Sequence, residues 1–138
     1  VGIDVEYISR NADCLEIAHK YFSPSEYTEL QQLPDIQMKE RFFELWTLKE
    51  AYMKACGLGL SLPLDEVSFT FPPKSAGPTD PASILMKDDE SWQLRLLSPS
   101  NLHKAALCVV HNDDIPTKMI IKKTIPLVTE ETFTMPED

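Results

Sequence analysis

The sequence has few cysteines, and none of them forms a recognisable site. The three, Cys14, Cys56 and Cys108, include no C-x-x-C pair, and an odd number cannot form a complete disulfide framework. This cysteine usage is typical of a reduced, cytoplasmic protein. No stretch approaches the ~18 apolar residues that a membrane span needs, and no signal-peptide pattern opens the chain. We therefore expect a cytoplasmic protein with no membrane partner.

Basic residues are also scarce, since 22 acids face 13 bases and the formal net charge is −9. A general nucleic-acid binder needs a basic face, so we expect no nucleic-acid partner. The sequence has no glycine-rich phosphate loop, no H-E-x-x-H and no G-x-S-x-G. These absences exclude the common phosphate-loop, zinc-protease and serine-hydrolase motifs.

The length and composition suit one soluble domain, or one lobe of a larger protein. The chain has 138 residues, of which 43% are apolar and 25% charged. Acids without bases crowd the last ten residues, which predicts a solvated end. We therefore expect a single domain over residues 1–123 and an acidic tail over residues 124–138.

Helix signals dominate the first half of the chain. One helix is expected at about Ala12–Lys20. Ser23 and Glu26 have the spacing of a capping box, which predicts the start of a second helix. A third and longest helix is expected over Asp35–Cys56, with its aspartate as the N-cap and Gly57 directly after its end.

Strand signals dominate the second half. Short runs rich in β-branched and aromatic residues alternate with prolines and turn residues. The expected strands are Val67–Phe71, Ser83–Met86, Trp92–Leu97, Lys104–Val110 and Lys118–Ile121. The order predicts an α+β fold with an N-terminal strand, then helices, then a mostly antiparallel sheet.

The first eight residues alternate as a strand does. Val1, Ile3, Val5 and Tyr7 share one face, and Gly2, Asp4 and Glu6 share the other. Asp4 and Glu6 would project side by side, roughly 7 Å apart at their bases. Such a pair of carboxylates can bind one hard cation such as Mg²⁺. The alternative is that both acids simply lie on the solvent-facing side of a half-buried strand.

The long helix carries a third acid among apolar residues. Phe43, Trp46 and Met53 fall within ~60° of Glu50 on a helical wheel. A carboxylate on an apolar face needs a partner, and either a metal ion or Lys54, one turn further on, could supply one. The alternative is an ordinary surface pair between Glu50 and Lys54 at i,i+4 spacing.

Together these acids suggest one site. If the helix packs on the strand, Asp4, Glu6 and Glu50 could surround a single cation, with lysines nearby to bind a diphosphate. Lys49 would point about 100° away from Glu50, towards the flank of this site or towards solvent.

Two segments carry a resemblance to a known family. Gly2-Ile3-Asp4-Val5-Glu6 is similar to a G-x-D-x-E strand, and the later segment is similar to a W-x-x-K-E-x-x-x-K helix. The later segment reads Trp46-Thr47-Leu48-Lys49-Glu50-Ala51-Tyr52-Met53-Lys54. With Gly57–Leu64 and His103–Ala106, these segments resemble the 4′-phosphopantetheinyl transferase superfamily over roughly residues 1–110.

The resemblance implies an enzyme, a holo-[acyl-carrier-protein] synthase. Such an enzyme moves the phosphopantetheine arm of coenzyme A onto a serine of an acyl or peptidyl carrier protein. By this resemblance Asp4, Glu6 and Glu50 would hold Mg²⁺, and Lys54 would contact the diphosphate of coenzyme A with Lys49 close by. Glu50 and Lys54 would be the catalytic residues, with Glu50 activating the carrier serine directly or through water.

The spacing of the strand motif implies a particular type within the family. D-x-E resembles the two-lobed, surfactin-synthetase-activating type, in which this strand opens the C-terminal lobe. We therefore expect another lobe or another copy of the chain to complete the site. The alternative function is a non-catalytic lobe that binds coenzyme A or a carrier protein and needs that partner for transfer.

Overall fold

The computed structural model places helices and strands in the predicted order. It describes residues 1–8, 13–71, 85–86, 91–110, 120, 122–125 and 129–132. The helices are α1 (Cys14–Tyr21), α2 (Pro24–Gln32) and α3 (Asp35–Cys56), followed by 3-10 turns at Gly59–Ser61 and Leu64–Glu66. The strands are β1 (Gly2–Tyr7), β2 (Phe69–Thr70), β3 (Leu85–Met86), β4 (Trp92–Ser100), β5 (His103–Val110), β6 (Lys122–Ile125) and β7 (Thr129–Thr132). The α+β prediction is confirmed.

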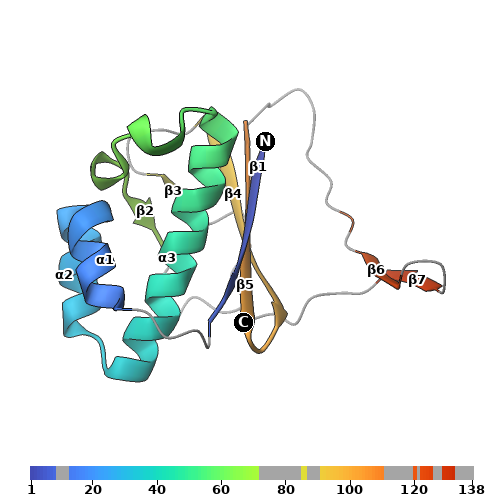
Figure 1. The fold of residues 1–138 in the computed structure, drawn as a ribbon, viewed down its shortest axis with the longest axis horizontal. Coiled ribbons are helices and arrows are strands. Elements are labelled where there is room, and N and C mark those ends of the chain that lie inside the picture. The colour runs from blue at the N-terminus through green and yellow to red at the C-terminus, as the bar shows by residue number, and fades with distance from the viewer. Residues whose placement is uncertain are drawn as a thin grey trace.

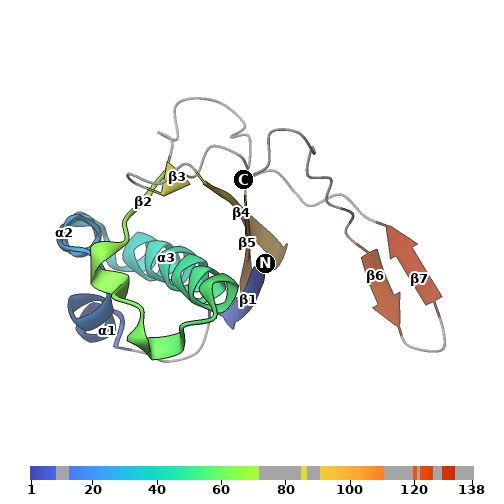
Figure 2. The ribbon, with the colours of Figure 1, turned by 90° about the horizontal axis from the view of Figure 1, so that it is seen from above.

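Three strands form the main sheet, in the order β1-β5-β4, and both pairings are antiparallel. Helix α3 packs along one face of this sheet, and α1 and α2 lie on the other side of α3 (Figures 1 and 2). The register places Asp4 opposite Ala106 and Glu6 opposite Lys104. The side of β1 that carries Gly2 and Asp4 faces α3.

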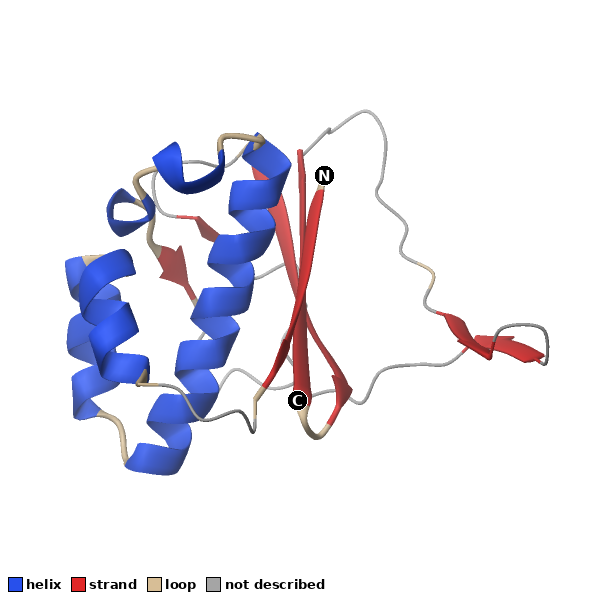
Figure 3. Ribbon diagram, viewed as in Figure 1, coloured by secondary structure: helices blue, strands red, loops and turns tan. Residues whose placement is uncertain are grey.

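Helix α3 is the centre of the core (Figure 3). It contributes a set of fully buried apolar side chains, namely Phe42, Phe43, Leu45, Leu48 and Ala51. It ends at Gly57, whose φ of 70° is a left-handed conformation that glycine adopts without strain. Its N-cap is Pro34, so the predicted capping role of Asp35 is wrong. Asp35 is instead the first helical residue and places its charge at the positive end of the helix.

Gly2 allows β1 to lie directly against α3. A Cβ atom at this position would stand 1.9 Å from the carbonyl oxygen of Ala51 and 2.5 Å from the backbone nitrogen of Ala55. Both are backbone atoms, which cannot rotate away as a side chain can. A glycine is therefore required for the distance at which the strand and the helix approach each other.

Some predicted boundaries differ from the observed ones. The strand expected over Val67–Phe71 is only two residues long, and most of Lys118–Ile121 lies outside the described residues. Strands β6 and β7 pair as a hairpin, with Thr124 opposite Glu130, and the domain boundary at residue 123 stays a prediction. No helix among the described residues is both long and apolar enough to cross a membrane.

Candidate functional site

The acidic side of β1 faces the protein interior, and the apolar side faces outward. Gly2 and Asp4 are buried, while Val1, Ile3 and Val5 are 80%, 62% and 58% exposed. The two-residue alternation is therefore as predicted, but the alternative that placed both acids towards solvent is wrong. The cause is α3, which covers the side of the strand that carries Gly2.

Lys54 joins the helix to the strand. Its Nζ lies 2.7 Å from Oδ1 of Asp4 and donates a second hydrogen bond, of 3.2 Å, to the carbonyl oxygen of Ile3. The Asp4 side chain is 9% exposed and the Lys54 side chain 50%. The ammonium group thus reaches a buried carboxylate from the solvent-accessible edge of the interface between β1 and α3.

The pKa of the Lys54 ammonium group responds to all three predicted acids. Its pKa is raised above the usual value, mainly by the hydrogen bond to Asp4, and partial desolvation opposes this rise. The negative charges of Asp4, Glu50 and Glu6 raise the pKa further. The structure therefore places Lys54 in direct contact with Asp4, and Glu6 and Glu50 interact electrostatically with the same ammonium group. We call Asp4, Glu6 and Glu50 the acidic cluster.

The acidic cluster has the chemistry that a hard cation requires. Carboxylate oxygens are the preferred ligands of Mg²⁺. Oδ2 of Asp4 is buried and has no hydrogen-bond partner, so this oxygen has an unused acceptor site next to the lysine. Within the described part of the chain, however, no three His, Cys, Asp or Glu side chains already form a metal-binding group. Metal binding by Asp4, Glu6 and Glu50 therefore stays a prediction that the residue types fit.

Lys49 lies away from the acidic cluster, in the interior between α2 and α3. Its side chain is fully buried, and its Nζ is 2.8 Å from Oε1 of Glu26. It also donates hydrogen bonds to the carbonyl oxygens of Leu64 and Val67. Burial lowers the pKa of Lys49, and the ion pair with Glu26 opposes that effect. The prediction that Lys49 points to the flank of the site or to solvent is wrong, because α2 and the segment after α3 cover it. We therefore do not assign it a contact with coenzyme A.

The sequence predicted only part of the role of Glu26. The capping box with Ser23 is confirmed, but the same carboxylate also binds Lys49 and accepts a hydrogen bond from the backbone N–H of Phe69. Its 2% exposure is unusual for a capping glutamate. The sequence signals the cap alone, because Lys49 and Phe69 are distant along the chain.

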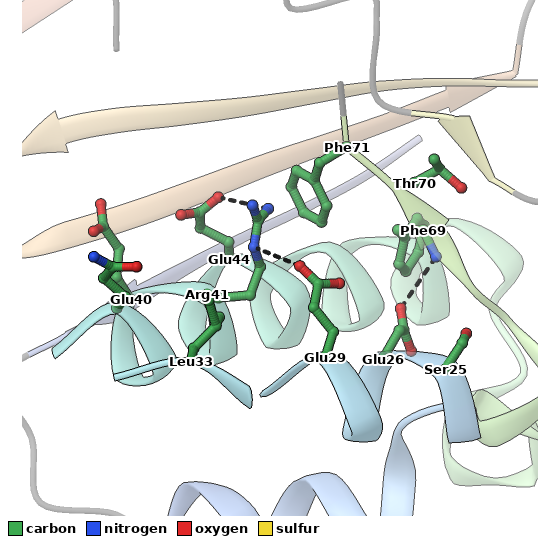
Figure 4. A pocket seen from close by; sticks show the side chains of 11 residues that line it. Ser25, Glu26, Glu29, Leu33, Glu40, Arg41, Glu44, Phe69, Thr70 and Phe71 are labelled. Atoms are coloured by element: carbon green, nitrogen blue, oxygen red, sulfur yellow. Dashed lines mark hydrogen bonds and ion pairs between the residues drawn. The ribbon is translucent and has the colours of Figure 1, made fainter. Parts of the chain in front are cut away.

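A separate hollow of about 490 Å³ lies between α2, α3 and β2 (Figure 4). Arg41 crosses it, with Nε 3.5 Å from Glu29 and Nη1 3.5 Å from Glu44, and its guanidinium lies 3.8 Å from the ring centre of Phe71. No residue of the acidic cluster lines this hollow. It is therefore distinct from the candidate site.

Comparison with known proteins supports the resemblance drawn from the motifs. A family model described as the 4′-phosphopantetheinyl transferase superfamily matches residues 1–110. The 4′-phosphopantetheinyl transferase HetI of a Nostoc species is 38% identical over 109 residues, which are 79% of this chain and 43% of that protein. The 4′-phosphopantetheinyl transferase Sfp of Bacillus subtilis is 34% identical over 114 residues, which are 82% of this chain and 48% of that protein. The chain thus spans about half the length of the curated relatives it matches.

Solved structures share the fold at lower identity. A holo-(acyl-carrier-protein) synthase from Bacillus anthracis, in complex with CoA (3′,5′-ADP), superposes with a TM-score of 0.59 at 19% identity and covers 79% of this chain and 92% of that one. The Helicobacter pylori holo-[acyl-carrier-protein] synthase, in complex with coenzyme A, gives 0.55 at 22% identity, over 80% of this chain and 98% of that one. These likenesses show that the fold is shared.

Proposed function

This chain belongs to the 4′-phosphopantetheinyl transferase superfamily, and from that premise we propose that it transfers the 4′-phosphopantetheine arm of coenzyme A to a serine of an acyl or peptidyl carrier protein. The observation that supports this most is the convergence of Asp4, Glu6 and Glu50 on Lys54. Two solved proteins with this fold bind coenzyme A or its nucleotide, which fits such a co-substrate.

In this proposal the diphosphate of coenzyme A lies beside the acidic cluster. Mg²⁺ held by Asp4, Glu6 and Glu50 would neutralise the diphosphate charge and hold it for in-line attack. Lys54 would turn its ammonium group from Asp4 towards a diphosphate oxygen, which its half-exposed side chain permits. The buried Oδ2 of Asp4, which has no hydrogen-bond partner, supports a cation at this position.

The transfer itself exchanges one P–O bond for another. The carrier serine oxygen bonds to the phosphorus next to the pantetheine arm, and the bond from that phosphorus to the bridging oxygen breaks. Adenosine 3′,5′-bisphosphate leaves with the electron pair. The serine proton passes to Glu50, directly or through a water molecule, because a carboxylate within hydrogen-bond reach can act as a general base.

We also propose that another lobe, or a second copy of the chain, completes this site. Val1, Ile3, Val5 and Tyr7 form an outer face of the sheet that is apolar and at least 46% exposed at each residue. Exposed apolar surface of this kind marks interaction sites in soluble proteins. A partner on this face is also what the alternative function requires, in which the chain alone binds coenzyme A or a carrier protein without catalysing transfer.

Mass spectrometry of an apo carrier protein incubated with coenzyme A and Mg²⁺ tests the proposal. We expect a mass gain of one phosphopantetheine arm on the serine, and its loss with EDTA or with Glu50→Gln. Glu66→Gln, an exposed acid outside the cluster, is the matched control and should retain activity. Transfer that persists in both Asp4→Asn and Glu50→Gln would exclude this role for the acidic cluster. Coenzyme A binding without transfer would support the binding-lobe alternative.

A further inference from the structure

Glu26 and Lys49 form a buried ion pair that the proposed chemistry does not use. Their side chains are 2% and 0% exposed. Burying two opposite charges is unfavourable unless both are fully hydrogen-bonded, and apolar residues of similar size often stabilise a protein equally well. Stability alone is therefore a weak explanation for this buried pair.

The hydrogen bonds of the buried pair connect four segments of the chain. Lys49 uses all three N–H donors: it binds Glu26 at 2.8 Å and donates to the carbonyl oxygens of Leu64 at 2.9 Å and Val67 at 2.6 Å. The second carboxylate oxygen of Glu26 accepts the N–H of Phe69 at 3.1 Å (Figure 4). Helix α2, helix α3, the turn after α3 and strand β2 are thus joined at one point.

This connection fixes the rotation of α3 about its own axis. Consecutive side chains on a helix point about 100° apart, so fixing the direction of Lys49 also fixes the direction of Glu50. On the side facing the sheet, Gly2 touches the backbone of Ala51 and sets the distance between helix and strand. The buried pair thus sets the rotation of α3 about its axis, and the contact at Gly2 sets the distance between α3 and β1.

We infer that Glu26 and Lys49 are positioning residues, which hold α3 in the rotation that aims Glu50 and Lys54 at Asp4. The inference rests on the proposed function only for the role of Glu50, since the contact between Lys54 and Asp4 exists without any ligand. Neither positioning residue needs to touch coenzyme A or the carrier protein.

The first test needs no ligand. A double-mutant cycle of Asp4→Asn and Lys54→Met, followed by urea unfolding, measures the coupling between these two residues. The cycle is run in three backgrounds: wild type, Glu26→Gln, and Leu30→Val. Leu30 is fully buried on α2 outside the pair, so its variant is the control for a general loss of stability.

We expect the coupling to persist in the wild type and in Leu30→Val, and to vanish in Glu26→Gln. Unchanged coupling in Glu26→Gln would overturn the inference. Glu26→Met/Lys49→Met, which replaces both charges with apolar side chains, gives a fourth background. We expect it to recover the urea midpoint of the wild type but not the coupling, because the carbonyl groups of Leu64 and Val67 lose their donor. Recovery of both would also overturn the inference.

The second test follows Mn²⁺, which accepts the same oxygen ligands as Mg²⁺, by electron paramagnetic resonance. We expect Glu26→Gln to bind Mn²⁺ at least ten-fold more weakly than Leu30→Val does. Equal affinities would show that the buried pair does not aim Glu50. If the wild type binds no Mn²⁺, the metal role in the proposed function fails, and the ligand-free cycle still decides the inference about positioning.

Discussion

Replacing Gly2 with alanine should separate β1 from α3 and inactivate the site. The added Cβ atom would lie 1.9 Å from the carbonyl oxygen of Ala51, whereas ordinary contacts begin at 3.4 Å. Because the closest atoms all belong to the backbone of α3, the strand and the helix must move apart. We expect Gly2→Ala to lower the free energy of unfolding by about 3 kcal/mol, the upper part of the usual range for overpacking.

The same movement should break the 2.7 Å contact between Lys54 and Asp4. A displacement of 1 Å in a catalytic group can lower activity by about 10²-fold, so transfer to a carrier protein should fall by at least that factor. Urea unfolding gives the stability, and mass spectrometry of the carrier gives the rate of transfer.

Gly59→Ala is the matched control for Gly2→Ala. Gly59 has a φ of 57°, and an added Cβ atom there meets nothing within 4 Å. The substitution should cost about 1 kcal/mol from backbone strain and leave transfer unchanged. If Gly2→Ala is as stable and as active as Gly59→Ala, the close approach of strand and helix does not control the site.

The remaining predictions concern charges and the outer face. Lys49→Met should lower the free energy of unfolding by about 3–5 kcal/mol, because it leaves Glu26 buried and unpaired; a loss below 1 kcal/mol in urea unfolding would contradict this. Asp4 raises the pKa of Lys54, so their pair stabilises the fold fully below the unfolded pKa of 10.5 and loses this effect as pH rises through the higher folded value. Lys54→Met should remove that pH dependence from the unfolding curves. Val5→Lys should change the free energy of unfolding by less than about 0.5 kcal/mol yet prevent association with a second lobe or copy, as sedimentation analysis would show.

Local signals predicted the helices well. The capping box at Ser23 and Glu26 starts α2 as expected, and Gly57 ends α3 in a left-handed conformation. Each of these features depends on residues within one or two turns of the chain, which is why the sequence alone can reveal them. The long helix does reach β1, where Lys54 contacts Asp4, and the gathering of Asp4, Glu6 and Glu50 round one cation stays a prediction.

Long-range features were harder to predict. A helical wheel gives the direction of Lys49 on an isolated helix, but it does not say that α2 and the turn after α3 bury that direction. The alternation along β1 defines two faces without saying which one is covered. Burying a charged carboxylate costs more than burying an apolar side chain, so the sequence alone favours burial of Val5 and its apolar neighbours over Asp4. In the structure α3 packs on the acidic side instead, and Asp4 is the buried residue.

Calorimetric titration of Mg²⁺ into this chain, in the presence of coenzyme A, tests most directly whether the acidic cluster binds a cation. We expect one ion per site, with affinity at least ten-fold weaker in each of Asp4→Asn, Glu6→Gln and Glu50→Gln than in Glu66→Gln. Wild-type affinity in all three cluster variants would contradict this expectation.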